Sequence, residues 1–208
     1  MKIGEEKIIP IAKRYYSPLP YHNFKHVTTL LKNAQELIKK CEKYHLKVDE
    51  EIVLLALLFH DAGYAENHKK KGFKSKEEYS AFISEKVLLD QKYPPEKIKK
   101  IKECITATHR DKEFRTIEQK IVRACDLKDL AANFKKFKKD NLLLKKEFEL
   151  LNHRKISSDE WKDITKKTIL FYLSQNIHLT PKYYNKEGKS IFHMKALKNL
   201  NKILNYSF

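Results

Sequence analysis

The sequence predicts an all-α protein, and three observations lead to that fold class. The 208 residues include only four glycines and six prolines, too few for the repeated tight turns of a β-barrel or for a glycine-rich nucleotide cradle. Apolar residues recur at three- and four-residue steps along most of the chain, and no segment of useful length alternates apolar and polar residues. We therefore expect about eight to nine helices in one compact domain over residues 1–208.

Periodicity places most of these helices. Four apolar stripes in the first two thirds of the chain predict helices over about residues 23–41, 50–62 and 77–91, and from residue 96. The helix over about residues 50–62 is apolar on every side, so we expect it to be central and buried, with Gly63 ending it in the left-handed conformation. A basic loop over residues 66–76 follows it.

The remaining helices follow from the same patterns. A buried helix contains Asp126, and a stripe over residues 130–151 predicts one long helix or two. Ser157 and Glu160 form a capping box before the next helix, and a last helix covers about residues 190–206.

The composition indicates a folded, strongly basic protein. Hydrophobic residues make up 41% of the chain, which excludes the disordered class, and the formal net charge is +17. The excess is lysine spread over many segments. It fits either a general lysine bias without function or a basic field that attracts phosphate-rich ligands, and the charge alone does not decide between them.

Cysteine usage and hydropathy predict a cytoplasmic protein. Cys41, Cys104 and Cys125 form no CxxC pair and cannot all pair among themselves, as expected in a reducing compartment. Acidic residues and a proline interrupt the first 20 residues, so we expect no export signal. The longest apolar run, residues 52–59, is far shorter than the about 20 residues that cross a bilayer, so we expect no membrane partner.

Histidines and aspartates at the edges of buried helices predict a metal site. His26 flanks the first stripe, His60 and Asp61 end the most hydrophobic helix, and Asp126 lies within another buried helix. Burying two carboxylates without compensation costs several kcal/mol, whereas a divalent cation held by two imidazoles and two carboxylates removes that cost. Taken singly, each residue has another explanation, such as a core histidine or a carboxylate paired with a nearby cation.

The order of several short motifs resembles the HD superfamily of metal-dependent phosphohydrolases. The motifs are YHNFKHV (21–27), FHDAGY (59–64), EEYSA (77–81), ITATH (105–109) and ACDL (124–127), and they resemble the branch that reads YHNxxH, HD, NExxSA, TxxH and DADL. The resemblance covers about residues 20–130 and implies an all-α fold around an ion held by His26, His60, Asp61 and Asp126. Lys76 stands where the branch has asparagine, and no motif is recognised in the helical C-terminal half, 131–208.

The expected ligands favour Mn²⁺, Fe²⁺, Co²⁺, Ni²⁺ or Zn²⁺ over Mg²⁺. A metal-activated water would then attack phosphorus without a covalent intermediate, with Asp61 also accepting the water's proton. Further candidates are His109, Glu77 and Glu78 for catalysis and His22, Arg110 and Lys112 for substrate binding. The histidines and glutamates among them have structural alternatives: a core or surface histidine, or a glutamate at the positive end of a helix.

The expected function is hydrolysis of a phosphoester of a small, nucleotide-like substrate. One alternative is a nuclease or cyclic-nucleotide phosphodiesterase with the same metal site, which would make a nucleic acid a partner and is supported by the charge. Cyclic di-GMP hydrolysis is not favoured, because the GYP element of that branch is absent. The other alternative is a non-catalytic module that binds nucleotide or nucleic acid. The presence of all four expected metal ligands argues against this alternative.

Overall fold

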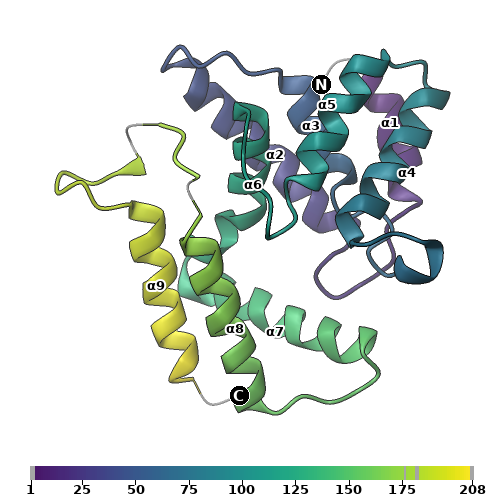
Figure 1. Cartoon of the computed structure of the whole chain (residues 1–208). Helices are drawn as coiled ribbons and strands as arrows, with labels where there is room; N and C mark the ends of the chain where they lie inside the picture. Colours follow the sequence, from purple (N-terminus) through teal and green to yellow (C-terminus); the bar gives the residue numbers. More distant parts are fainter. Residues whose placement is uncertain (1–2, 176, 181–182, 207–208) are drawn as a thin grey trace. The chain divides into compact units, whose positions relative to one another are not determined.

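The computed structural model describes residues 3–175, 177–180 and 183–206, and this part of the chain is all-α (Figure 1). Its described elements are nine α-helices and two short 3-10 helices. Among the same residues, the only β-type pairing is an isolated bridge between Tyr184 and Ser190. The predicted fold class and number of helices are therefore confirmed.

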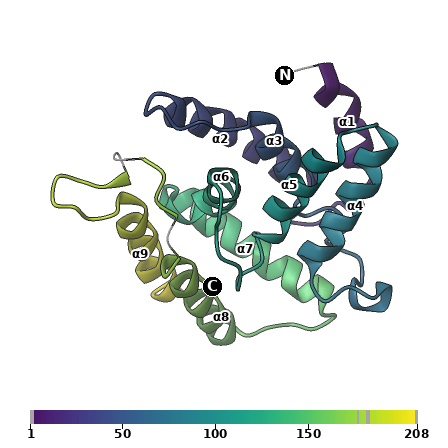
Figure 2. The ribbon, with the colours of Figure 1, turned by 45° about the horizontal axis from the view of Figure 1, so that its top comes forward.

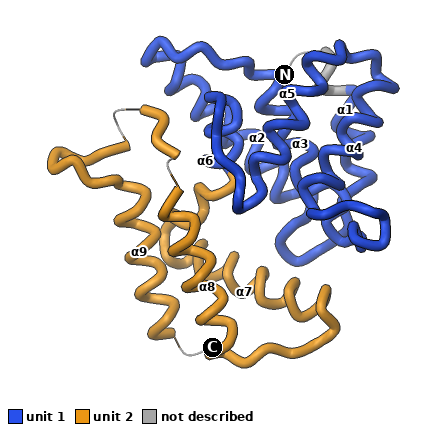
Figure 3. The backbone as a smooth tube through the Cα atoms, viewed as in Figure 1, with its two compact units in different colours: residues 1–125 blue, residues 126–208 orange. Residues whose placement is uncertain are grey.

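The chain divides into two compact units, Met1–Cys125 and Asp126–Phe208 (Figure 3). The division falls inside a helix, Ile117–Leu127. The expectation of one domain over residues 1–208, with a motif core at about 20–130, stays a prediction.

Unit 1 is built around a central apolar helix. Every residue of that helix, α3, from Ile52 to Phe59 is buried, and α3 contacts α1, α2, α4 and α5 (Figure 2). The prediction of a buried central helix is thus confirmed. The bounds in this unit are α1 (Ile3–Lys13), α2 (Phe24–Glu42), α3 (Glu50–Phe59), η1 (Lys69–Lys71), α4 (Lys76–Asp90) and α5 (Pro95–Thr106), followed by α6 (Ile117–Leu127), which crosses the division.

One helix boundary in unit 1 differs from its prediction, and one helix was not predicted. Gly63 has the predicted left-handed conformation, with φ of 74°, but helix α3 ends at Phe59 rather than near residue 62, so Gly63 is part of the following turn. The reason is tertiary, because the Gly63 N–H donates to the Tyr15 carbonyl at 2.9 Å instead of capping α3. Helix α1 was not predicted. Its apolar face is short, with Ile8 and Ala12 buried, and Pro10 lies inside it.

Unit 2 contains η2 (Lys128–Ala131), α7 (Phe134–Leu151), α8 (Ser158–Leu173) and α9 (Ile191–Leu204). Asn133 caps α7 by accepting the Lys136 N–H at 3.0 Å, so the stripe over residues 130–151 is a 3-10 turn followed by a single long helix. Ser157 caps α8 by accepting the Glu160 N–H at 3.2 Å, as predicted. Helix α9 packs on η2, α7 and α8.

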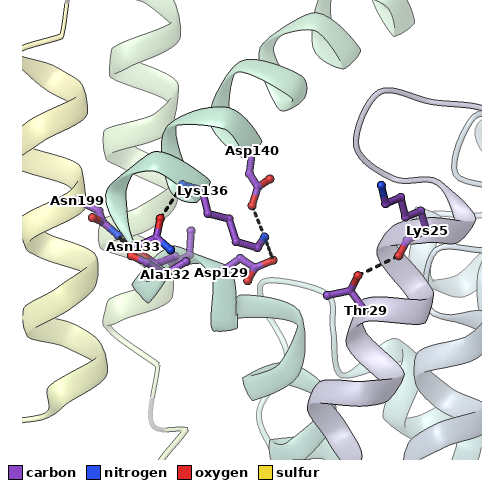
Figure 4. Close-up of polar contacts among 9 residues, drawn as sticks. Lys25, Thr29, Asp129, Ala132, Asn133, Lys136, Asp140 and Asn199 are labelled. Carbon is purple, nitrogen blue, oxygen red and sulfur yellow. Dashed lines mark hydrogen bonds and ion pairs between the residues drawn. The ribbon is translucent and has the colours of Figure 1, made fainter.

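Polar contacts fix the beginning of unit 2 (Figure 4). The Lys136 ammonium lies 2.6 Å from a carboxylate oxygen of Asp129 and 2.6 Å from one of Asp140. The Asn199 side-chain amide donates to the carbonyls of Leu130 at 2.9 Å and Ala132 at 2.8 Å. The 3-10 turn that directly follows α6 is therefore tied to α9.

Thiols and indole are segregated between the units. Cys41, Cys104 and Cys125 are buried, form no disulfide and lie in unit 1. The single tryptophan, Trp161, lies in unit 2, where its ring N–H donates to the buried Asn141 side chain at 2.9 Å. Over the described residues, no helix is both long enough and apolar enough to cross a membrane.

Candidate metal centre

Three helices contribute to one group of metal-type ligands. One ligand atom each of His26, His60 and Asp126 lie within 4.8 Å of one another. Asp126 is in the last turn of α6, whose residues 117–125 belong to unit 1, so continuity of the helix carries the carboxylate with that unit. Ligand atoms about 2.1 Å from an ion lie about 3 Å apart when adjacent and about 4 Å apart when opposite. The group, whose ligand atoms are up to 4.8 Å apart, could therefore hold one shared cation after a small contraction.

A hydrogen bond at Nδ1 fixes the orientation of the His60 ring. Its Nδ1 lies 2.8 Å from the Leu57 carbonyl oxygen, which can only accept, so Nδ1 carries a proton and Nε2 is the nitrogen that a metal ion would use. The side chain is 2% exposed. A backbone carbonyl behind a buried imidazole is the arrangement that prepares a histidine for metal ligation.

Asp61 lies beside His60 but outside the three-residue group. Its Oδ2 is 2.8 Å from His60 Nε2, a spacing close to the about 3 Å expected of adjacent ligands. Burial raises the pKa of the Asp61 carboxyl, but the positive charge of the nearby His60, His22 and His26 imidazoles in their protonated forms outweighs burial, and the pKa is lowered overall. Asp61 is thus held as a carboxylate.

Asn23 positions His26 at the start of α2. Its side-chain oxygen accepts the N–H groups of Lys25 at 3.0 Å and His26 at 3.2 Å, and its amide donates to the Leu19 carbonyl at 2.8 Å. The asparagine of the YHN motif therefore caps the helix and fixes the preceding loop, which sets the position of His26 in the first turn.

The turn after His60 and Asp61 is locked by two further residues. The buried Ser80 hydroxyl, from α4, donates to the Ala62 carbonyl at 2.8 Å. A Cβ on Gly63 would lie 2.6 Å from the Tyr79 ring, closer than carbon atoms can approach, and its φ of 74° favours glycine. The serine of the EEYSA motif and the glycine after the His-Asp pair therefore hold the turn against α4.

Tyr16 is a neighbour of the site that sequence reasoning missed. Its hydroxyl donates to the Leu58 carbonyl at 2.8 Å. Burial, and then the negative charge of Asp61, raise the pKa of Tyr16 well above its ordinary value, which keeps the phenol neutral beside that carboxylate. No spacing rule marks Tyr16, because it lies in the loop before α2.

Of the predicted substrate-binding residues, His22 lies beside the group. Its ring stacks on Tyr64 with centroids 4.0 Å apart and lies 5.9 Å from the His26 ring in an edge arrangement. Arg110 and Lys112 are exposed, in the loop after α5. The binding roles of all three stay predictions.

Like Asp61, the other predicted catalytic candidates lie outside the three-residue group. The His109 side chain is 31% exposed, and its Nδ1 accepts the Asp111 N–H at 3.3 Å. Glu78 accepts the Lys74 N–H at 3.0 Å, at the beginning of α4, and Glu77 lies in the first turn of the same helix. Glu78 therefore has a structural task, and the catalytic roles of His109, Glu77 and Glu78 stay predictions.

The region of the chain that contains this group of residues matches a known protein family. The HD domain family model matches residues 23–131, more than half of the chain. The chain belongs to the HD domain family. The matched region contains His26, His60, Asp61 and Asp126, and it confirms the superfamily suggested by the motifs, but not the particular branch. No curated protein matches the chain. HD domains bind divalent metals and occur in a superfamily of metal-dependent phosphohydrolases, so the family and the His/Asp group point to the same chemistry.

Proposed function

We propose that this HD-domain protein is a metal-dependent phosphohydrolase that acts on a phosphoester of a small, nucleotide-like substrate. The observation that carries the proposal is the convergence of His26, His60 and Asp126 within 4.8 Å, inside the region that the family model matches. The partly buried carboxylate of Asp61, next to His60, is the proposed fourth member of a set of two imidazoles and two carboxylates.

This donor set fits a divalent transition metal. Mixed imidazole and carboxylate ligands suit Mn²⁺, Fe²⁺, Co²⁺, Ni²⁺ or Zn²⁺ better than Mg²⁺, which prefers oxygen. When bound, such an ion supplies Lewis-acid polarisation of the phosphoester and lowers the pKa of a water near the phosphorus.

The protein's own residues supply orientation and proton transfer. His60 presents Nε2 in a fixed tautomer, because Nδ1 donates to Leu57. Asp61, kept charged by its surrounding imidazoles, accepts the proton of the attacking water. The hydrogen bond from Ser80 to the Ala62 carbonyl holds the turn that carries His60 and Asp61 in place, so little reorganisation is needed at the moment of reaction.

A nuclease or cyclic-nucleotide phosphodiesterase is the second candidate function, and the net charge of +17 favours it. Salt dependence separates the two. Binding of a phosphate polymer weakens steeply with added salt because counterions are released from the polymer, whereas binding of a small nucleotide weakens much less.

The test begins with elemental analysis of the purified protein. It continues with phosphate release from nucleoside mono-, di- and triphosphates and cyclic nucleotides in the presence of Mn²⁺, Mg²⁺, Co²⁺ or Ni²⁺. Asp61→Ala is expected to lose metal and hydrolysis together, whereas the control Asp111→Ala, at an exposed carboxylate, keeps both. Full metal occupancy and turnover in Asp61→Ala would refute the site, and no phosphate release by the wild type would favour a polymer substrate or a binding function.

A further inference from the structure

An open groove lies along α9 in unit 2. Its volume is about 790 Å³, and all of its lining residues fall within residues 126–208. We call this surface the α9 groove, and it is lined by Phe134, Met194, Leu197, Lys198, Asn201, Lys202, Asn205 and Tyr206. None of these residues has a role in the proposed function, so the groove is a surface separate from the candidate metal centre.

The floor of the α9 groove is apolar and reaches solvent. Met194 and Leu197 are three residues apart on α9 and are 41% and 40% exposed. Phe134 and Tyr206 also line the groove, and they pack against a buried cluster of unit 2 that consists of Phe137, Ile169, Leu200 and Ile203. Because a packed core supports the groove, a partner would meet a surface that needs little reorganisation on binding.

Positive charge surrounds this apolar floor. Helix α9 contains three lysines and no acidic residue, and among the described lining residues two are lysines and none is acidic. The Lys202 ammonium lies 5.2 Å from the centroid of the Phe134 ring, and that of Lys138 lies 4.6 Å from the centroid of the Tyr206 ring. Such contacts orient the ammonium groups over the rings that line the groove. The complementary partner therefore has an apolar stripe with carboxylates beside it.

The dimensions of the α9 groove fit a helix. Met194 and Asn205 both line it, and the chain between them rises about 16 Å along the helix axis, or about three turns. An amphipathic helix docks in such a groove through apolar residues spaced three and four apart. A helix of similar length can therefore present an apolar face to Met194 and Leu197 and carboxylates to the lysines.

A phosphate polymer matches the α9 groove less well. Single-stranded nucleic acids gain affinity by stacking their bases on aromatic side chains, whereas both rings of the groove already have an ammonium group over them. Met194 and Leu197 provide apolar contact but no hydrogen-bond donor for a phosphate oxygen. An apolar face flanked by carboxylates is the better complement to this combination of side chains.

We propose that the α9 groove is a docking site for an acidic amphipathic helix of a partner protein. Met194 and Leu197 contact the apolar face of that helix, and Lys198 and Lys202 pair with its carboxylates. The apolar contact supplies affinity, while the charges increase the rate of association and fix the orientation. The inference does not depend on the proposed function, because no lining residue belongs to the candidate metal centre.

The test measures binding of a defined peptide to the full-length protein. A fluorescein-labelled peptide of about 15 residues, long enough to cover the groove, carries leucines spaced three and four apart and glutamates on the positions beside them. The comparison peptide has the same composition, but its leucines are distributed around the helix. Fluorescence anisotropy should show about tenfold or more tighter binding of the first peptide, because only this peptide can bury an apolar face.

Matched substitutions locate the binding surface. Leu197→Glu should weaken binding of the amphipathic peptide about tenfold or more, because it removes apolar contact and places a negative charge opposite the glutamates of the peptide. The control is Leu170→Glu, at a leucine of α8 that is 44% exposed but does not line the groove, and this variant should bind as the wild type does. Circular dichroism and Trp161 emission show whether each variant folds.

A charge reversal distinguishes ion pairing from a folding defect. The double variant Lys198→Glu/Lys202→Glu should bind the acidic peptide about tenfold more weakly than the wild type does. It should bind a peptide with lysines in place of the glutamates more tightly than the wild type does. A variant that has merely lost its structure cannot gain affinity in this way, so failure of the exchange contradicts the pairing.

Other occupants of the α9 groove are tested in parallel. A short oligouridine tests a nucleic acid, and phosphatidylcholine vesicles with and without phosphatidylglycerol test an anionic membrane. If Leu197→Glu weakens binding of either probe while the wild type binds no peptide, the groove takes that class of partner and the proposal fails. The proposal also fails if the wild type binds both peptides equally, or if Leu170→Glu weakens binding as much as Leu197→Glu does.

Discussion

His60 and His109 each come after a helix with a buried apolar face, but their surroundings are very different. His60 comes directly after α3, is 2% exposed and has its Nδ1 fixed by the Leu57 carbonyl. His109 comes shortly after α5, and its side chain is 31% exposed. The buried Arg123 donates to the His109 carbonyl at 2.9 Å, so the backbone of His109 is anchored while its ring stays partly in solvent.

The difference lies in what supports each ring. A histidine becomes a good ligand when its ring is desolvated and its other nitrogen is engaged by a fixed acceptor. His60 meets both conditions, whereas the Nδ1 of His109 accepts a hydrogen bond from the exposed Asp111. Position at the end of an apolar stripe is therefore insufficient to identify a ligand.

The largest expected effect is on metal affinity. Removing a residue that only supports a metal ligand typically lowers metal affinity about 10–100-fold. Because His60 is itself a proposed ligand, His60→Ala should lower Mn²⁺ affinity by more than that. His109→Ala should reduce it less than tenfold, because the His109 ring lies outside the ligand group. Calorimetric titration of both variants checks the contrast, and equal losses would place His109 at the metal.

The second effect concerns the turn that supports His60. Gly63 and Gly72 both have positive φ, but a Cβ would clash only at Gly63, where the Tyr79 ring is 2.6 Å away. Gly72→Ala should cost only the left-handed strain, about 1–2 kcal/mol. Gly63→Ala should cost about 1–3 kcal/mol more, because of overpacking. Urea denaturation of the two variants measures the difference, and equal costs would show that Tyr79 moves aside freely.

A smaller effect is expected from the contact between α4 and the turn. Ser80→Ala leaves the Ala62 carbonyl without its buried donor and should cost about 1–3 kcal/mol, with weaker Mn²⁺ binding. Ser84→Ala is the matched control, because Ser84 is also buried on α4 but donates to Ala81 in the same helix. If the two variants bind Mn²⁺ equally well, the Ser80 contact does not position His60.

The smallest effect should come from the exposed loop around His109. Arg110→Ala and Lys112→Ala should change the free energy of unfolding by less than about 0.5 kcal/mol, as is usual for surface substitutions. Any change in activity should appear in KM rather than in kcat or metal content, because uniform substrate binding acts on KM. A fall in kcat at constant KM would instead give these cations a role in the transition state.

The helices could be predicted where packing follows local periodicity. The stripe of α2 and the all-round apolar run of α3 each specify burial by themselves, and Ser157 caps α8 as its spacing indicates. The end of α3 could not be predicted, because Gly63 donates to Tyr15, a residue distant in sequence. Helix α1 was missed because its buried face is short.

The sequence was sufficient to predict the ligand types of the candidate site, but not the contacts that hold those ligands in place. His26, His60 and Asp126 are conspicuous as polar residues on buried helices, and the structure brings their ligand atoms together. The contacts that hold them cross between elements, as Ser80 to Ala62 and Tyr16 to Leu58 do. The cation of Lys76 over Tyr64 is of the same kind, since no spacing in the sequence pairs those two residues.

Because the cysteines lie in one unit and the tryptophan lies in the other, each unit has its own reporter. Thiol alkylation reports on the first unit and tryptophan fluorescence on the second. Burial raises the pKa of the Cys41 and Cys104 thiols, so they resist alkylation until the helices around them open. Alkylation rates would therefore follow the opening of residues 1–125, while Trp161 emission follows the rest of the chain. Adding Mn²⁺ should change the alkylation rate by a larger factor than it changes the Trp161 emission. Such a difference would show which unit the ion stabilises.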